Sequence, residues 1–275
     1  MFNKKLLYLI FLLTCLSYFF YFSGVSFEDK LSPNKNVMAD SNGIPSIKTQ
    51  PYKSIALVNK NDSLIDYKKK DQTKALYLTF DDGPNKHTKK IISILKKKDI
   101  NATFFMLNEN ILKNREVTIA VKKAGNQLGC HGVTHNVNRF YQTKKAPLKE
   151  METCKKSILK VSGYDTHLIR VPYGSYPYLS SIQKKYLEKA GFVLWDWNVD
   201  SQDWLNKGKS PKLLINHVIK QVKAQKKLGN TPVILLHDTD ISVRALPKLI
   251  DKLLKMGYSF QTIEEDLQPL QFKRR

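Results

Sequence analysis

Apolar positions in the second part of the chain alternate between short continuous runs and longer segments with helical spacing. The short runs predict buried strands, and segments 87–98, 148–163 and 210–225 each carry the single apolar stripe of a surface helix. This alternation predicts an α/β fold with a parallel sheet, whose reactive groups collect at the carboxyl ends of the strands. The predicted strands are residues 76–80, 102–107, 127–130, 168–171, 192–196, 233–236 and, more weakly, 258–262.

The first 27 residues follow a different pattern. Lys4 and Lys5 precede residues 6–22, a run of 17 residues without a charge, which is at the lower limit for crossing a bilayer and long for the core of a signal peptide. No clear cleavage motif follows, so an uncleaved membrane anchor is favoured, with secretion after cleavage as the alternative. The two lysines are expected inside the cell and the rest of the chain outside.

The remaining boundaries follow from composition. Residues 28–72 are rich in Pro, Asn, Ser and Lys without a sustained period, which is typical of a linker, and one short ordered piece is expected at residues 54–60. We expect four parts: a short cytoplasmic N-terminus with an anchor or signal at 1–27, an extracellular linker at 28–72, the main folded domain at 73–267 and a basic tail at 268–275.

The chain is strongly basic, with 46 Lys and Arg against 24 Asp and Glu and a net charge of +22. Removal of residues 1–27, which hold two lysines and no acid, leaves 44 against 24, or +20. The lysines are scattered over predicted helix surfaces, so a nucleic-acid site is not indicated. The charge suits anionic cell-wall polymers or a membrane surface, although a solubilising role explains the scatter about as well. We expect a monomer.

Polar residues capable of chemistry follow the ends of most predicted strands. Asp81 and Asp82 end an apolar strand, which costs stability unless a cation or a proton compensates their charges. His131 and His135 are four residues apart in a Gly-containing turn, a spacing that lets two imidazoles bind one ion. One nearby carboxylate would complete a three-ligand catalytic metal site. If Asp82 is that ligand, Asp81 can act as a general base toward water.

Two further residues arrive from other strand ends. His237 can serve as a general acid on a leaving amine, and Arg170 can hold the base in position. The other histidines of this region, His87, His167 and His217, are interpreted as structural.

Five motifs in this order, TFDDGP, HGVTH, RVPYG, DSQDW and LLHD, resemble those of the carbohydrate esterase family 4 polysaccharide deacetylases, the NodB homology domain. The resemblance runs from about residue 73 to residue 267. It implies a distorted (β/α)7 barrel and the metal-dependent removal of N-acetyl, sometimes O-acetyl, groups from extracellular glycans. The metal is expected to be Zn²⁺.

The resemblance also implies a role for each residue that matches a motif. Asp81 matches the catalytic base, Arg170 its brace, His237 the acid and Asp203 the carboxylate that tunes this acid. The metal ligands would be Asp82, His131 and His135. Tyr173 matches the residue whose backbone N–H helps to hold the oxyanion, Trp204 a wall of the substrate groove, and Leu235 the floor of the pocket for the acetyl methyl group.

One position departs from the family pattern. The family usually has Ser or Thr directly after the first His, and this chain has Gly132. The missing hydroxyl puts the rigidity of the ligand loop and its affinity for metal in question, with Thr134 as a possible substitute. Asn136 replaces a frequent Pro, which predicts a less preorganised loop.

The predicted activity is therefore de-N-acetylation of N-acetylglucosamine-type residues in peptidoglycan or a wall-attached polysaccharide, with release of acetate. The alternatives are an O-acetyl esterase, a chitooligosaccharide deacetylase and a non-catalytic wall-glycan-binding protein. A non-haem iron oxygenase is disfavoured because it needs no base, Arg and acid from other strands. A metalloprotease is disfavoured because the spacing lacks the Glu of the H-E-x-x-H motif.

Cys130 and Cys154 are the only cysteines beyond the predicted anchor. Strand alternation directs Cys130 toward the surrounding helices, and Cys154 falls on the apolar stripe of the next helix. An extracellular location would allow a disulfide between them, and the alternative is two separate buried thiols.

Overall fold

The computed structural model describes residues 74–205 and 210–273. The predicted anchor at 1–27 and linker at 28–72 lie outside the described residues. Among those described, no helix combines the length and apolarity needed to cross a membrane.

In the described residues, eight strands form one sheet in the order β5-β4-β3-β2-β1-β7-β6, and β8 pairs with β1. Every strand pairing is parallel, as predicted. β8 pairs with the first half of β1 and β2 with its second half. The strands are β1 (Ala75–Asp81), β2 (Thr103–Met106), β3 (Gln127–Cys130), β4 (Leu168–Ile169), β5 (Val193–Leu194), β6 (Val199–Asp200), β7 (Val233–His237) and β8 (Ser259–Gln261).

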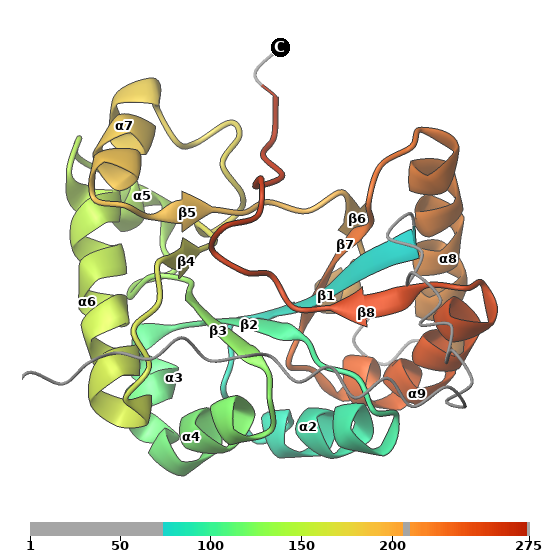
Figure 1. The fold of residues 1–275 in the computed structure, drawn as a ribbon. Coiled ribbons are helices and arrows are strands. Elements are labelled where there is room, and N and C mark those ends of the chain that lie inside the picture. The colour runs from blue at the N-terminus through green and yellow to red at the C-terminus, as the bar shows by residue number, and fades with distance from the viewer. Residues whose placement is uncertain (1–73, 206–209, 274–275) are drawn as a thin grey trace, which may run out of the picture. The chain divides into compact units, whose positions relative to one another are not determined.

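The prediction of a distorted barrel is confirmed for the curled parallel sheet and its helices, and it is corrected for the number of strands, which is eight in the described residues rather than seven. β6 was not predicted, and β5 and β6 are the two edges of the sheet although they are consecutive in sequence. The five residue steps from Leu194 to Val199 span at most about 17 Å, and Figure 1 shows this connection crossing between the edges. Among the described residues β5 and β6 are not paired with each other, so the sheet is open between them.

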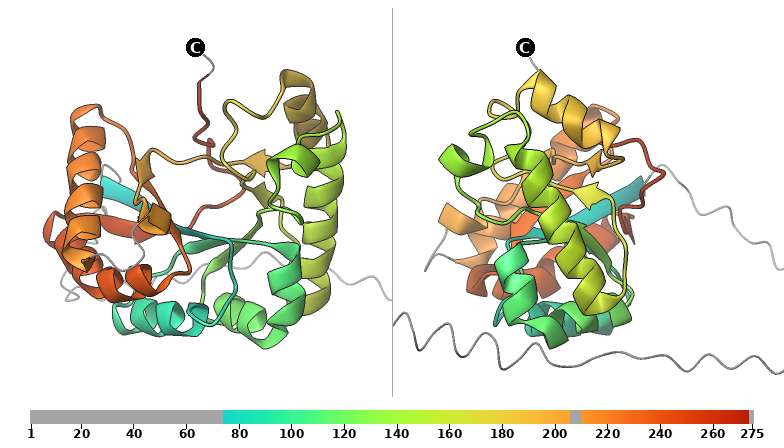
Figure 2. Two further views of the ribbon diagram at one scale, coloured as in Figure 1. Left: turned by 180° about the vertical axis from the view of Figure 1, so that it is seen from behind. Right: turned by 90° about the vertical axis from the view of Figure 1, so that its left-hand side faces the viewer.

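The helices pack around one face of the curled sheet (Figures 1 and 2). Their apolar sides and alternate strand residues such as Leu76, Leu78 and Phe80 form the larger core cluster, as the predicted apolar stripes require. The helices are α2 (Thr88–Lys97), α3 (Asn108–Lys113), α4 (Arg115–Lys123), α5 (Val137–Phe140), α6 (Ala146–Ser162), α7 (Ser181–Lys189), α8 (Pro211–Lys227) and α9 (Asp240–Lys255), with a 3₁₀ turn η2 (Asp203–Leu205).

The inner face of the sheet carries a second, smaller apolar cluster. Phe105, Trp195 and Ile263 are buried in it, and Leu267 and Leu270 from the C-terminal segment pack against it. The backbone N–H of Asp196 donates to the Leu270 carbonyl at 2.8 Å. The packed part of the domain therefore continues into the segment expected to be a basic tail.

Cys130 and Cys154 are both buried free thiols. They belong to the core cluster between sheet and helices, so the predicted orientation of both side chains is confirmed. Burial and then the hydrogen bond with Cys154 raise the pKa of the Cys130 thiol. The structure thus has the two cysteines as neighbouring thiols rather than as a disulfide.

Candidate active site

The carboxyl ends of β1, β3 and β7 bring most of the predicted site residues together. Asp81 on β1 is the register partner of His237 on the neighbouring strand β7. Asp82 and His131 follow directly after β1 and β3. Because all strands run parallel, their carboxyl ends lie at the same edge of the sheet.

Asp82, His131 and His135 form a compact cluster whose potential ligand atoms all lie within 4.8 Å of one another. The Oδ1 atom of Asp82 is 3.5 Å from Nε2 of His131 and 3.4 Å from Nε2 of His135. The structure thus gathers the three residues predicted to bind metal.

His131 presents an unprotonated nitrogen to this cluster. Its Nδ1 lies 2.6 Å from the carbonyl oxygen of Arg170, a contact that requires Nδ1 to donate. Burial lowers the pKa of His131 to about 3, so the imidazole is neutral and Nε2 keeps its lone pair. A backbone carbonyl that fixes the tautomer of a ligand histidine in this way is typical of metal sites.

These residues fit a divalent cation. Oδ1 of Asp82 is buried and has no hydrogen-bond partner among the described residues, although an unpaired buried carboxylate oxygen is costly. It faces the Nε2 lone pair of His131, and two acceptors so close require a cation or a proton between them. One carboxylate and two imidazoles suit Zn²⁺ and related transition metals, and three protein ligands leave positions open.

The backbone of Asp82 is held in an uncommon conformation. Its φ of 69° lies in the left-handed region, which non-glycine residues rarely adopt and which clusters at functional sites. The side chain of Asn110 donates to the Asp82 carbonyl at 2.7 Å. The chain therefore turns sharply between the two aspartates, and each carboxylate has different neighbours.

Asp81 forms a buried ion pair with Arg170. Nη1 of Arg170 donates to Oδ1 of Asp81 at 2.9 Å, and the two side chains are 0% and 3% exposed. Burial raises the pKa of Asp81, while the charges of Arg170 and then His237 act in the opposite direction.

Arg170 is itself fixed by several other acceptors. Its guanidinium donates to Thr79 Oγ1 at 2.7 Å and to the carbonyl oxygens of Trp195 and Asp196 at 3.2 and 3.1 Å. The guanidinium also lies 4.3 Å from the ring centre of Phe105, within cation–π distance. The segment that joins the two sheet edges therefore helps to orient Arg170 and, through it, the Asp81 carboxylate.

His237 and Asp203 form a second polar pair. Nδ1 of His237 lies 2.7 Å from Oδ1 of Asp203, and the His237 backbone N–H donates to Oδ2 at 2.7 Å. Burial alone would lower the pKa of His237, but the hydrogen bond and charge of Asp203, and then the charges of Asp81 and Asp82, raise it to about 9. The imidazole is thus protonated at neutral pH, with Nε2 4.0 Å from Oδ2 of Asp82.

The remaining three predicted residues lie around this centre. Tyr173 is 46% exposed and has a φ of 65°, and its backbone N–H has no acceptor among the residues that the structure describes. Leu235 is buried on β7 two residues before His237, so both side chains face the same side of the sheet. Trp204, directly after Asp203, is 57% exposed.

Sequence reasoning missed Glu150, which contacts the loop between the two histidines. Its carboxylate accepts hydrogen bonds from the backbone N–H groups of Val133 and Thr134, both at 2.9 Å. Glu150 lies on α6 among the polar positions of an amphipathic helix, where a carboxylate is ordinarily interpreted as a solvated surface residue. The side chain of Asn136 accepts from the Arg139 N–H at 3.1 Å and caps α5, so this loop end is ordered without a proline.

Asp238 is a second carboxylate without a predicted role. It is 3% exposed, and its Oδ2 accepts from the Thr88 hydroxyl while its Oδ1 has no partner in the described residues. Burial raises its pKa to about 7. Its position next to His237 within the LLHD motif could have marked it as a candidate.

Comparisons with known proteins agree with this geometry. A family model described as polysaccharide deacetylase matches residues 68–195. The chain is 42% identical to the putative polysaccharide deacetylase YheN of Bacillus subtilis, over 72% of this chain and 70% of the relative. It is 31% identical to a peptidoglycan-N-acetylglucosamine deacetylase of Bacillus cereus, over 87% of this chain and 86% of the relative.

The fold is similar to that of a solved structure. The crystal structure of the polysaccharide deacetylase Bc1974 from Bacillus cereus superposes with a TM-score of 0.67 at 32% identity, over 72% of this chain and 97% of that one.

Proposed function

The chain belongs to the carbohydrate esterase family 4 polysaccharide deacetylases, and on this premise we propose that it removes N-acetyl groups from N-acetylglucosamine-type residues of an extracellular cell-wall glycan. As a member of this family it is a hydrolase. The proposal rests above all on one arrangement: the Asp82, His131 and His135 cluster lies between a buried Asp81–Arg170 pair and an Asp203–His237 pair. The proposed base, ligand set and acid are therefore neighbours, which supports the proposal.

Asp82, His131 and His135 would hold the divalent metal, for which zinc is our proposal. When bound there, it would supply Lewis-acid chemistry, polarising the acetyl carbonyl and making a water molecule more acidic.

The chain's own residues supply the proton transfers. Asp81 takes a proton from the attacking water, and its raised pKa makes it a stronger base than an ordinary Asp. Arg170 fixes the carboxylate in the orientation that this transfer requires. The water oxygen bonds to the acetyl carbon, and the Tyr173 N–H is available to stabilise the negative charge that develops on the carbonyl oxygen.

Breaking the C–N bond requires a proton on the departing nitrogen. His237 is protonated at neutral pH because Asp203 raises its pKa, and it can donate from Nε2 while Asp203 holds Nδ1. The products are acetate and a free amine. We propose that Leu235 contacts the acetyl methyl group and that the exposed ring of Trp204 forms one side of the sugar-binding groove.

Action at the cell wall is supported by the Bacillus cereus relative, which is named for peptidoglycan, and by the anchor predicted at residues 1–27. We propose that the domain acts outside the cell. The basic net charge of +22 would favour accumulation at an anionic wall.

The test is to incubate the protein and zinc with purified peptidoglycan from which O-acetyl groups have been removed by mild base, and to measure acetate and free amine. Equal amounts of both are expected, with Asp81→Asn as the inactive control. Acetate without amine from untreated glycan would indicate an O-acetyl esterase. A clear preference for chitooligosaccharides over peptidoglycan would indicate that chitooligosaccharides are the substrate. Glycan binding without acetate release would indicate a non-catalytic protein.

A further inference from the structure

The loop from His131 to His135 carries two of the three proposed metal ligands. The carboxylate of Glu150, which is outside the metal cluster, accepts hydrogen bonds from the residues between the two histidines. Oε2 of Glu150 accepts from the N–H groups of Val133 and Thr134, each at 2.9 Å, and Oε1 accepts from the Thr134 hydroxyl at 2.7 Å. Hydrogen bonds to a charged acceptor are stronger than neutral ones. These contacts fix consecutive backbone groups between the two histidines.

Glu150 approaches the loop from a rigid element. It lies in the first half of α6, a helix of 17 residues (Ala146–Ser162) whose buried residues Met151 and Cys154 anchor it in the main core. No ion pair of Glu150 occurs within residues 74–205 and 210–273. In the described structure its charge is therefore met by the donors of the ligand loop.

The space beside Gly132 is occupied by Phe140 and by the Glu150 carboxylate. Gly132 has a φ of +97°, and a Cβ atom added to it would lie 2.9 Å from Cε2 of Phe140 and 3.2 Å from Oε2 of Glu150. A serine or threonine does not fit this backbone without a shift. The Glu150 carboxylate thus lies close to the place from which a hydroxyl at position 132 would act.

We propose that Glu150 is a positioning residue that orders the His131–His135 loop before metal binds, in place of the missing hydroxyl at residue 132. The inference rests on the proposed metal-dependent function, and it adds a residue that touches neither metal nor substrate. Partners that orient metal ligands typically contribute 10–100-fold to metal affinity. Loss of the Glu150 carboxylate is expected to weaken zinc binding by about this factor.

The experiment measures two properties of the full chain without using activity. Zinc affinity is obtained by competition with a chromophoric chelator, and hydrogen exchange of the 131–135 amides is followed in the metal-free protein. The variants are Glu150→Ala, Glu150→Gln and the milder Thr134→Val, which removes one donor. Glu152→Ala is the matched control, since Glu152 is exposed on the same helix two residues away.

Glu150→Ala is expected to lose exchange protection at Val133 and Thr134 and about 10–100-fold in zinc affinity. Glu150→Gln should recover much of both, because its amide oxygen can accept from the two N–H groups and its NH₂ can donate to the Thr134 hydroxyl oxygen. Thr134→Val should show a smaller loss, and Glu152→Ala none.

Unchanged zinc affinity or unchanged exchange in folded Glu150→Ala would overturn the positioning role. If Glu150→Ala does not fold, zinc affinity and exchange protection in Thr134→Val that equal those of the wild type would overturn it. A different failure, in which the wild-type chain binds no zinc or other divalent ion, would refute the proposed metal centre itself. The two hypotheses are therefore distinguished by the wild-type measurement.

Discussion

Asp81 and Asp82 are neighbours in sequence, yet the structure compensates their charges in different ways. Asp81 is paired with Arg170 in a buried site, where the loss of one partner from an ion pair costs roughly 3–5 kcal/mol. Asp82 turns toward the imidazoles of His131 and His135, and its Oδ1 has no donor among the described residues. A cation is therefore needed at Asp82 and not at Asp81, which separates the proposed ligand from the proposed base.

This difference gives the first prediction. Asp82→Asn, His131→Ala and His135→Ala should each lose metal and activity together, because two ligands are too few to hold the ion. Asp81→Asn should keep the metal and lose turnover, because the base is needed in the chemical step. Metal content of the purified variants, measured by mass spectrometry, and acetate release are the readouts. Loss of metal in Asp81→Asn with retention in Asp82→Asn would reverse the two roles.

The second prediction concerns the alkaline limb of the pH–rate profile. His237 must be protonated to donate, and its pKa is raised to about 9, so activity is present at neutral pH and is lost as pH rises toward that value. A bound cation would offset the contributions of Asp81 and Asp82 to the raised pKa of His237 but would leave that of Asp203. The midpoint of the alkaline limb should therefore lie at or below about pH 9. Asp203→Asn removes the main contribution that raises the pKa of His237, so the midpoint of the alkaline limb should fall by roughly one to three pH units.

Ser242→Ala is the control for this shift. It removes a hydrogen bond to Asp203 and keeps the charge, so its limb should move less. His237→Ala should retain metal and lose turnover by roughly 10²–10⁴-fold. An alkaline limb at the same pH in wild type and Asp203→Asn would rule out His237 as the titrating acid.

The third prediction is that replacing Gly132 with serine, one of the residues usual in the family at this position, lowers both stability and zinc affinity. Gly132→Ser should lower the free energy of unfolding by about 1–3 kcal/mol and weaken zinc binding, because φ is +97° and the new Cβ meets Phe140 and Glu150. Gly163→Ser is the matched control: Gly163 also has a positive φ, +70°, but nothing lies within 4 Å of its Cβ position. Denaturant unfolding of both variants separates crowding from backbone strain. Greater stability in Gly132→Ser than in wild type would contradict this account.

At the scale of elements, the sequence predicts the helices and strands that are long enough to show a periodic pattern of apolar residues. The stripes at 87–98, 148–163 and 210–225 correspond to α2, α6 and α8, and even the weak strand at 258–262 exists as β8. β6 was missed because its two residues lie between polar ones and cannot show a period. The two edges of the sheet were not predicted either, since they depend on where this short strand pairs.

The same limit applies to the site. Its motif residues could be predicted because they follow strand ends in order, and the structure brings the ligand set, the Asp81–Arg170 pair and the Asp203–His237 pair together. Glu150 and Thr79 could not be predicted in this way. Their roles depend on which distant segments α6 and β1 face, and one sequence gives no information on that contact.

The C-terminal segment gives the fourth prediction. The buried Asp196 carboxylate accepts from the Phe272 N–H at 2.8 Å, and the Asp196 carbonyl accepts from Arg170. Deleting residues 268–275 removes this donor and the half-buried Leu270 and Phe272, so the free energy of unfolding should fall by about 2–4 kcal/mol. Deacetylation should also slow, since the segment supports the backbone that orients Arg170.

The control for this truncation removes only residues 274–275 and should unfold like wild type. Thermal and denaturant unfolding measure the stability, and acetate release measures the activity. Equal stability of the two truncated chains would show that the segment contributes nothing to the fold.

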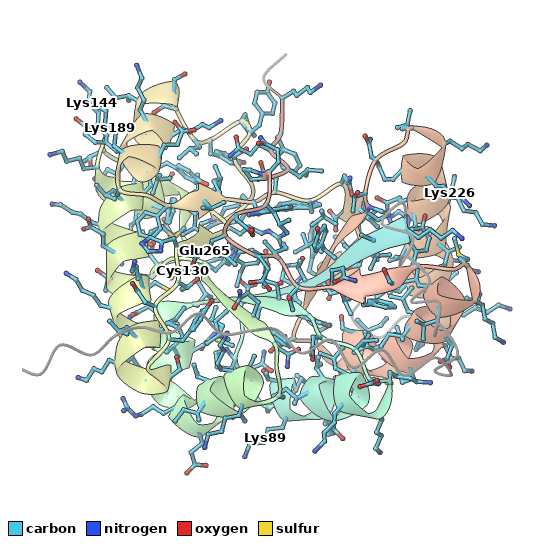
Figure 3. The ribbon with its side chains drawn as sticks, viewed as in Figure 1. Lys89, Cys130, Lys144, Lys189, Lys226 and Glu265 are labelled. Carbon is cyan, nitrogen blue, oxygen red and sulfur yellow. The ribbon has the colours of Figure 1, made fainter. Side chains whose placement is uncertain are left out.

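At the scale of the whole molecule, positive charge is distributed rather than concentrated. Lys89, Lys226 and the pair Lys144 and Lys189 project from three different sides in Figure 3, and all four side chains are exposed. Few lysines are paired: among the described residues, ion pairs involve Lys98, Lys113, Lys155 and Lys184. A distributed charge attracts a polyanion in many orientations, so at the proposed anionic wall it would concentrate the protein without fixing how the site meets the proposed glycan.

The fifth prediction follows from this distribution. Binding of the full chain, in neutral detergent, to wall fragments that carry anionic polymers should weaken steeply between low and physiological salt, because exposed charges are screened within about 8–10 Å. Two triple variants test where the charge acts. One replaces three exposed lysines of α8 with glutamine (Lys223→Gln, Lys226→Gln and Lys227→Gln), and the other replaces three exposed lysines of α2 (Lys89→Gln, Lys90→Gln and Lys96→Gln). Both should weaken binding by about the same amount, because each removes the same charge. Sedimentation with the fragments measures the bound fraction. Loss of binding in one triple variant alone would instead reveal a localised site on that helix, and binding that does not change with salt would show that net charge has no part in it.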